Sequence, residues 1–120
     1  MNNRALGTQG EARAAAYLTA HGCTICERNF RVKTGEIDII ADDRGTLVFV
    51  EVKTRTGTQY GTPAQAVDFR KRNKIVQTAY WYLRQRQIDD RPCRFDVIEV
   101  YAVPSGDWQV RHIKGAFEAT

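Results

Sequence analysis

Apolar positions along the chain follow two different periods, and their alternation predicts the order of the elements. An alanine-rich helix is expected over about residues 5–20, closed by Gly22. A strand follows over about residues 24–30. Two further strands, GEIDIIADD and TLVFVEVKT, are rich in β-branched residues, and an Asp-Arg-Gly turn at 43–45 joins them into a hairpin.

The second half of the chain predicts one more helix and two more strands. A Thr-Pro-Ala-Gln capping box at residues 62–65 is typical of a helix start. An apolar stripe at helical spacing follows, made by Ile75, Val76, Ala79, Tyr80 and Leu83. Basic residues interrupt this stripe upstream, so we expect the helix to start or bend near Asp68. Residues 93–103 and 108–113 predict a last strand pair around a Pro-Ser-Gly-Asp turn.

The predicted order is αβββαββ, within a single domain that spans residues 1–120. The sequence contains no internal repeat, low-complexity tract or linker. A strand that leaves a hairpin, crosses by a helix and returns to the sheet indicates an α/β fold. We therefore expect a mixed central β-sheet flanked by helices.

Charged residues interrupt the first hairpin strand, although an inner strand of such a sheet is usually apolar almost throughout. Side chains alternate between the two faces of a strand. Glu36 and Asp38 are therefore expected on one face, with Ile37 and Ile39 on the other.

The second hairpin strand carries Glu51 and Lys53 on one face and its valines on the other. The turn places Asp38 opposite residues 48–50 and Glu51 near Glu36, and a shift of one or two residues brings Asp38 beside Glu51. Clustered carboxylates repel one another, and a divalent cation would offset this, because Mg²⁺ favours one or two carboxylates with substrate phosphate oxygens. Lys53 would stabilise charge that develops on the phosphate, or it forms a plain salt bridge with Glu51 or Glu36.

The first predicted helix supplies a further carboxylate. Gly7, Glu11, Ala14 and Leu18 lie along one stripe, which we expect to be the packed face. A carboxylate on that stripe suits a site at the edge of the core. In the alternative interpretation, Glu11 borders the stripe and reaches water.

The net charge of +4 is unevenly distributed. Residues 54–87 hold seven basic residues and one acid, whereas acidic residues outnumber basic ones in the rest of the chain. This pattern favours a face that meets phosphates, and the alternative is a solvated basic helix face. The seven are Arg55, Arg70, Lys71, Arg72, Lys74, Arg84 and Arg86.

Cysteine usage and the N-terminus indicate a cytosolic protein. Cys23, Cys26 and Cys93 lack a disulfide-framework spacing, and zinc binding would need scattered partners such as His21 or His112, so we expect buried thiols. No stretch approaches the roughly 18 apolar residues that a membrane span needs. Charged residues interrupt the N-terminal segment where a signal peptide is apolar. No membrane partner is therefore expected.

Several short motifs, taken together, are distinctive. They are G-x-x-G-E at 7–11, R-N at 28–29, GEIDII at 35–40, FVEVKTR at 49–55, and Tyr60-Gly61 followed by Pro63. In these motifs the chain resembles the YraN family over about residues 7–100. That is a bacterial family of uncharacterised proteins, regarded as predicted nucleases and related to archaeal Holliday junction resolvases. The wider group is the PD-(D/E)xK nuclease superfamily, although here Ile37, and not proline, precedes Asp38.

This resemblance implies a restriction-endonuclease-like fold and a nuclease that hydrolyses phosphodiester bonds with Mg²⁺ or Mn²⁺. It assigns the metal to Asp38, Glu51 and Glu11, assistance in hydrolysis to Lys53, and accessory places to Glu36 and Gln65. We expect nucleic acid, DNA in the first place, to bind at Arg55, Arg70, Lys71, Arg72 and Lys74. Branched DNA and a homodimer are expected by analogy alone. The alternatives are a non-catalytic nucleic-acid-binding protein on the same fold, and a structural protein whose charged strands form ion pairs.

Overall fold

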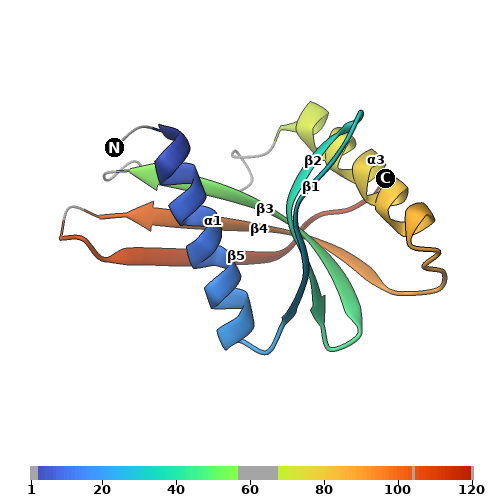
Figure 1. Cartoon of the computed structure of the whole chain (residues 1–120), viewed down its shortest axis with the longest axis horizontal. Coiled ribbons are helices and arrows are strands. Elements are labelled where there is room, and N and C mark those ends of the chain that lie inside the picture. The colour runs from blue at the N-terminus through green and yellow to red at the C-terminus, as the bar shows by residue number, and fades with distance from the viewer. Residues whose placement is uncertain (1–2, 57–67, 104, 120) are drawn as a thin grey trace.

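The elements of the protein follow the predicted order αβββαββ. The computed structural model describes residues 3–56, 68–103 and 105–119. The elements are α1 (Asn3–Ala20), β1 (Thr24–Val32), β2 (Gly35–Asp43), β3 (Thr46–Thr56), α3 (Phe69–Gln85), β4 (Cys93–Ala102) and β5 (Trp108–Phe117). The strands form one sheet in the order β1-β2-β3-β4-β5, in which β3 and β4 run parallel and the other neighbours antiparallel. The expected α/β fold is confirmed, with the mixed sheet lying between the two helices (Figure 1).

Each helix buries one face of the sheet. The cluster under α1 includes Ala14, Leu18, Val48, Val50, Val52, Ile98 and Val100. The cluster under α3 includes Ile40, Phe49, Ile75, Val76, Ala79, Tyr82 and Phe95. The expectation that Tyr80 belongs to the core was wrong, since Tyr80 is 52% exposed whereas Tyr82 is buried. The buried positions of α3 continue from Ile75 through Ala79 to Tyr82 in steps of four and three, which leaves Tyr80 on the outer side.

Local sequence signals account for two element boundaries, the turn between β2 and β3 and the start of α3. Arg44 and Gly45 between β2 and β3 have φ values of 52° and 98°, as a two-residue turn with both central residues left-handed requires. α3 begins at Phe69, because Asp68 caps it by accepting a hydrogen bond from the Lys71 N–H at 2.9 Å. The predicted boundary near Asp68 is confirmed, while the capping box at 62–65, Gln65 included, lies outside the described residues.

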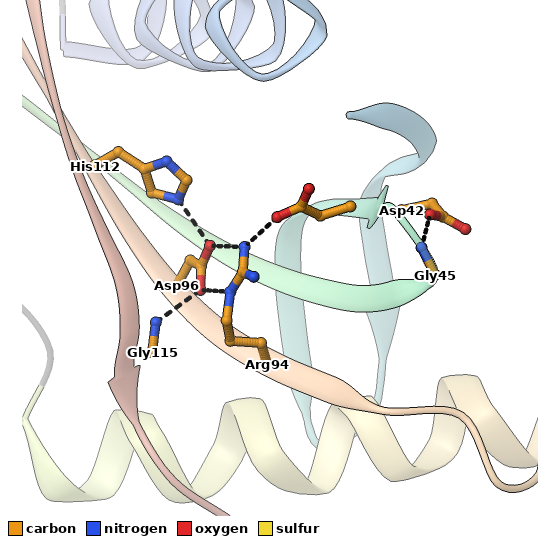
Figure 2. A network of polar contacts seen from close by, with 7 residues as sticks. Asp42, Gly45, Arg94, Asp96, His112 and Gly115 are labelled. Atoms are coloured by element: carbon orange, nitrogen blue, oxygen red, sulfur yellow. Dashed lines mark hydrogen bonds and ion pairs between the residues drawn. The ribbon is translucent and has the colours of Figure 1, made fainter. Parts of the chain in front are cut away.

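A buried polar network joins β4 to β5 and to the end of β2 (Figure 2). The fully buried Asp96 carboxylate accepts from Arg94 Nε at 2.8 Å and from the Gly115 N–H at 3.0 Å, and His112 Nε2 lies 2.7 Å from its Oδ2. Arg94 also contacts Asp43 at 3.0 Å. Burial alone would raise the pKa of Asp96, but the hydrogen bonds from His112, Arg94 and Gly115 outweigh burial, and the pKa is lowered. The network therefore has a structural role, holding a buried charge with several partners.

The structure corrects one expectation drawn from composition, which concerns the burial of the cysteines. The cysteines are free thiols, but Cys23 is buried whereas Cys26 and Cys93 are exposed, so the expected burial of all three was wrong. Of the suggested zinc partners, His112 is held by Asp96. In the part of the chain that the structure describes, no helix combines the length and the apolar character needed to cross a membrane.

α1 approaches β3 very closely at the buried Gly10. A Cβ atom at Gly10 would overlap the hydroxyl of Thr54, whereas a Cβ at Gly7 would meet nothing within 4 Å. We expect Gly10→Ala to lower the free energy of unfolding by about 1–3 kcal/mol, the usual effect of overpacking. Gly7→Ala is the matched control and should be neutral or slightly stabilising, since alanine is the better helix former. Urea unfolding curves measure both, and equal stability of the two variants would contradict this close approach.

Candidate functional site

The site forms where β2 separates from β3. The last residue pair between these strands joins Ile39 to Val50, while β2 remains paired with β1 as far as Gly35. The β1–β2 hairpin therefore leaves β3 at Asp38, and Figure 1 shows it curving away from the rest of the sheet. Beyond the last pair, Val52 of β3 donates its backbone N–H to Asp38 Oδ2 at 2.8 Å. The Asp38 side chain thus takes the place of the strand partner that β3 loses.

This separation corrects the predicted alternation in β2. Ile37 belongs to the cluster under α3 and Ile39 to the cluster under α1, so the expectation that they share a face was wrong. Ile37 and Ile40 share a cluster although they are three residues apart, which shows that the alternation breaks at Asp38. The register Ile39 to Val50 brings Asp38 to the position across from Glu51, one residue beyond the predicted range of 48–50.

Glu51 lies in β3 and is 5% exposed, with two ammonium groups close to the same carboxylate oxygen. Its Oε1 lies 2.6 Å from Lys71 Nζ and 3.9 Å from Lys53 Nζ. Lys53 reaches Glu51 because residues two apart in a strand share a face. Lys71 reaches it from the first turn of α3, a contact that no sequence spacing indicated. The structure therefore places Lys71 in the same site as Lys53, where the sequence had suggested a phosphate contact alone.

The carboxylates of the site perturb the titration of Asp38. Burial, followed by the negative charge of Glu51, raises the pKa of Asp38 to about 7, although the N–H of Val52 opposes this shift. The charges of Glu11 and Glu36 act in the same direction as Glu51. Near neutral pH Asp38 is therefore poised between its protonated and ionised forms, and a cation bound beside it would favour the ionised form.

The two lysines of the site differ in how firmly they hold their protons. Burial and the contact with Lys71 lower the pKa of Lys53. Burial also disfavours the charge on Lys71, but its hydrogen bond to Glu51 outweighs burial and raises the pKa of Lys71. Lys71 therefore neutralises Glu51, while Lys53 is the lysine whose proton is more easily given up.

Asn29 of β1 links two further carboxylates. Its backbone is left-handed, with φ of 55°, a conformation that few residues other than glycine adopt and that often marks functional positions. Its amide nitrogen donates to Glu11 Oε1 at 2.8 Å and to Glu36 Oε1 at 3.1 Å, an orientation assigned from these two acceptors. Burial, with the charge of Glu36 next, raises the pKa of Glu11. The sequence placed Asn29 in the R-N motif at 28–29 without a role. Its left-handed backbone, which marks it as unusual within a strand, is visible only in the structure.

These side chains surround two adjoining hollows, together named the carboxylate cleft. One hollow, of about 340 Å³, is lined by Glu11, Asp38, Glu51, Lys53 and Lys71 among others. The other, of about 360 Å³, is lined by Glu36, Asp38, Glu51, Arg70, Lys71 and Lys74 among others. Because Asp38, Glu51 and Lys71 line both, the hollows meet at these three residues. The structure thus gathers most of the predicted site residues around one cleft.

Two of the predicted phosphate-binding residues are placed differently. Arg55 of β3 lies with its Nε 2.8 Å from Oε2 of the fully buried Glu99, which also accepts from the Tyr101 hydroxyl at 2.6 Å. The guanidinium of Arg72 lies over the Phe117 ring, 5.6 Å from its centre. Both arginines therefore have contacts within the fold, and Arg70, Lys71 and Lys74 are the predicted cations that line the cleft.

The donor chemistry of the cleft fits a hard divalent cation bound by two carboxylates. Among residues 3–56, 68–103 and 105–119, no three His, Cys, Asp or Glu side chains are arranged to hold an ion together. Mg²⁺, however, commonly takes one or two protein carboxylates and completes its shell with waters and substrate phosphates. Asp38 and Glu51 provide such a pair, and a cation there would replace the ammonium of Lys71 at Glu51 Oε1.

We expect Asp38→Asn to change how stability depends on pH. The pKa of Asp38 is about 7 in the folded protein against an ordinary value of 3.8, so folding is coupled to proton uptake between these values. The stability that Asp38 contributes is complete below about pH 4 and is lost as pH rises through 7. Asp38→Asn should therefore melt above the wild type at pH 8 in EDTA, and the difference should shrink toward pH 4. Melting curves that stay parallel from pH 4 to 8 would contradict the repulsion among these carboxylates.

The same melting experiment tests the cation. A ligand that binds the folded form alone adds about 1.4 kcal/mol at ten times its Kd. Mg²⁺ or Mn²⁺ should raise the melting temperature of the wild type over its value in EDTA and leave that of Asp38→Asn unchanged. An equal response of the two proteins would place the metal elsewhere.

Comparison with known proteins shows the family of the chain. The family model described as "Uncharacterised protein family UPF0102" matches residues 10–100. A UPF0102 protein of Symbiobacterium thermophilum is 49% identical over 98% of this chain and 99% of its own length. UPF0102 proteins of Clostridioides difficile (44% identical, 98% and 100%) and Persephonella marina (45% identical, 93% and 92%) are similar over the same extent. The chain therefore belongs to the uncharacterised UPF0102 family, which is the YraN family that its motifs resemble.

Proposed function

We propose that this protein is a metal-dependent nuclease with a restriction-endonuclease-like fold, which hydrolyses phosphodiester bonds of nucleic acid. The observation that carries the proposal is the position of Asp38 and Glu51 at the point where β2 leaves β3, with Lys53 beside them. The basic first turns of α3 line the same cleft. The carboxylates can hold a metal ion that activates water. The neighbouring cations can stabilise the negative charge of the phosphate, and the cleft therefore suits phosphodiester hydrolysis.

Each residue of the cleft then has a distinct task. A bound Mg²⁺ or Mn²⁺ would supply an activated water and neutralise phosphate charge. Asp38 and Glu51 would hold the cation through their oxygens, and the Val52 N–H fixes the orientation of Asp38. Lys53 directs its ammonium at the charge that develops on the phosphate in the transition state. Glu11 and Glu36, both held by Asn29, line the two hollows and add negative charge next to the metal pair.

The cations of α3 place the nucleic-acid backbone next to this centre. Arg70 and Lys74 are exposed and line the cleft. Each phosphate contact on a duplex contributes about −0.9 to the slope of log affinity against log salt. We expect the double variant Arg70→Glu with Lys74→Glu to flatten this slope by nearly two. Fluorescence anisotropy with labelled DNA between 50 and 200 mM salt, the range over which such contacts matter most, measures it.

A matched control separates local contacts from net charge. Arg84→Glu with Lys114→Glu makes the same change in net charge at exposed positions that are absent from the described lining of the cleft. This control should retain the wild-type slope. Equal flattening in both double variants would mean that binding follows the total charge, and would remove α3 from the interface.

A non-catalytic nucleic-acid-binding protein is the second candidate. The contact of Lys71 with Glu51 favours it, because an internal ammonium already neutralises the carboxylate that a metal would need. Both candidate functions use the basic surface to bind nucleic acid, but only the nuclease cleaves the bound strand.

A cleavage screen distinguishes these candidates. Purified protein is incubated with end-labelled single strands, duplexes, flaps and four-way junctions, as DNA and as RNA, in Mg²⁺, Mn²⁺ or EDTA. The nuclease proposal predicts products from at least one substrate, DNA first, in metal and none in EDTA. Salt-dependent binding of every substrate without any product would favour the binding protein.

A further inference from the structure

Phe69 is a large apolar side chain that the core does not use. It is 76% exposed, against 52% for Tyr80 and 44% for Trp81, the other large hydrophobic residues that are exposed in the described chain. Its position is the first residue of α3, directly after the capping Asp68 that lines the carboxylate cleft. A single exposed aromatic side chain is not unusual in itself. The position of Phe69, beside a charged cleft and among cations, is what makes it a candidate contact for a ligand.

The surroundings of Phe69 carry positive charge and amide groups. Phe69 lines a hollow of about 500 Å³, named the Phe69 hollow, together with Lys33, Arg70, Asn73, Lys74 and Gln77. None of the described residues that line it is acidic. A second hollow, of about 270 Å³, also uses Phe69, along with Arg72, Asn73 and one acidic residue, Glu118. The ring therefore stands between two hollows, where a flat ligand can reach it.

The Phe69 hollow is continuous with the carboxylate cleft. Arg70 and Lys74 line both, so a chain that runs from one to the other passes the same two cations. The cations match a polyanion, while the aromatic ring in the same hollow matches a flat apolar group that repeats along such a polyanion. A strand of nucleic acid whose bases are unpaired has both features, since its phosphates alternate with π faces that stack on aromatic side chains.

We propose that Phe69 stacks on an unpaired base of a single-stranded nucleic-acid segment, whose neighbouring phosphates contact Arg70 and Lys74. This inference rests on the proposed function, and it names the substrate class: a strand with unpaired bases next to the scissile phosphate. Asn73 and Gln77 offer amide groups to the edge of the stacked base. A fully paired duplex would use the same cations but not the ring, because its bases are already stacked on one another.

Binding to matched single-stranded and duplex DNA tests the stacking. All proteins carry Asp38→Asn so that cleavage does not interfere, and anisotropy gives the affinities. Phe69→Leu retains an apolar side chain and removes the π face. It should lower single-strand affinity roughly fivefold or more, the effect of losing one base stack. Duplex affinity should stay within twofold, and the salt slope should stay unchanged because no charge is lost.

Two further variants make the result specific. Phe69→Trp should retain single-strand affinity, since indole also stacks. Tyr80→Leu, an exposed aromatic on the same helix outside the Phe69 hollow, should bind both substrates like the parent. Unchanged single-strand affinity in Phe69→Leu would overturn the inference, as would an equal loss on single strand and duplex. Cleavage plays no part in these binding measurements. A negative stacking result therefore does not contradict the nuclease proposal, and a wild-type protein that cuts no substrate does not contradict a positive stacking result.

Discussion

Lys53→Ala is expected to slow cleavage by about 10²–10³-fold, the usual effect of removing one group that stabilises transition-state charge. Binding of Mg²⁺ should survive, because an ammonium group is not a metal ligand. Lys53 Nζ also lies 3.9 Å from Glu51 Oε1. Its removal takes a positive charge away from the carboxylate and should therefore strengthen metal binding slightly. Single-turnover cleavage and calorimetric titration with Mg²⁺ measure the two effects separately.

Glu51→Gln provides the contrast for Lys53→Ala. This variant removes a carboxylate from the proposed metal pair and should lose both cleavage and Mg²⁺ binding. If Lys53 serves as a salt-bridge partner alone, Lys53→Ala should bind Mg²⁺ more tightly and cleave within a few-fold of the wild type. That outcome would remove Lys53 from the chemistry and leave the metal site in place.

Lys71→Ala is expected to have opposite effects on the metal-free and metal-bound protein. Lys71 Nζ lies 2.6 Å from Oε1 of Glu51, which is 6% exposed at its side chain. Removing this cation leaves a buried carboxylate beside Asp38 without its nearest partner. The free energy of unfolding in EDTA should fall by about 1–3 kcal/mol, less than for a fully buried pair because Lys71 is 43% exposed. Mg²⁺ should then bind more tightly, since it no longer competes with an ammonium for Glu51.

Lys74→Ala is the matched control for Lys71→Ala. Lys74 lines the same cleft from the next turn of α3 and is exposed, so its loss should change neither the stability in EDTA nor the affinity for Mg²⁺. Chemical unfolding with and without Mg²⁺ gives both quantities. If Lys71→Ala binds Mg²⁺ no more tightly than the wild type, the ammonium does not occupy the metal position. The binding-protein alternative would then lose its structural support, because Lys71 would not block the cleft.

The parts of the fold that rest on local pattern were predictable from the sequence. The β2–β3 hairpin follows from β-branched runs on either side of Arg44 and Gly45, whose left-handed backbone the turn requires. The proximity of Asp38 and Glu51 follows from the same hairpin to within a residue. The start of α3 near Asp68 follows from the basic residues that interrupt the apolar stripe upstream, whereas the capping role of Asp68 itself is seen only in the structure.

The parts that depend on long-range packing were not predictable. Lys71 meets Glu51 because the packing of α3 against the sheet brings its first turn beside Glu51 of β3, and no periodicity in either element records that contact. The side chains of Ile37 and Ile39 point to different faces because β2 changes its partners at Asp38, whereas alternation assumes a regular strand. The stripe predicted from the sequence contained Tyr80 and not Tyr82, and which of the two is buried depends on how α3 is rotated over the sheet.

Asp38 is the residue on which the proposed hydrolytic metal centre depends most. Its most direct test is single-turnover cleavage by wild type and Asp38→Asn, purified identically, on the best substrate of the screen in Mg²⁺. We expect the wild type to cut in Mg²⁺ and not in EDTA, and Asp38→Asn to be slower by at least about 10²-fold. Cleavage by Asp38→Asn at the wild-type rate would contradict a metal centre at Asp38, since the activity would then arise from another site or another protein.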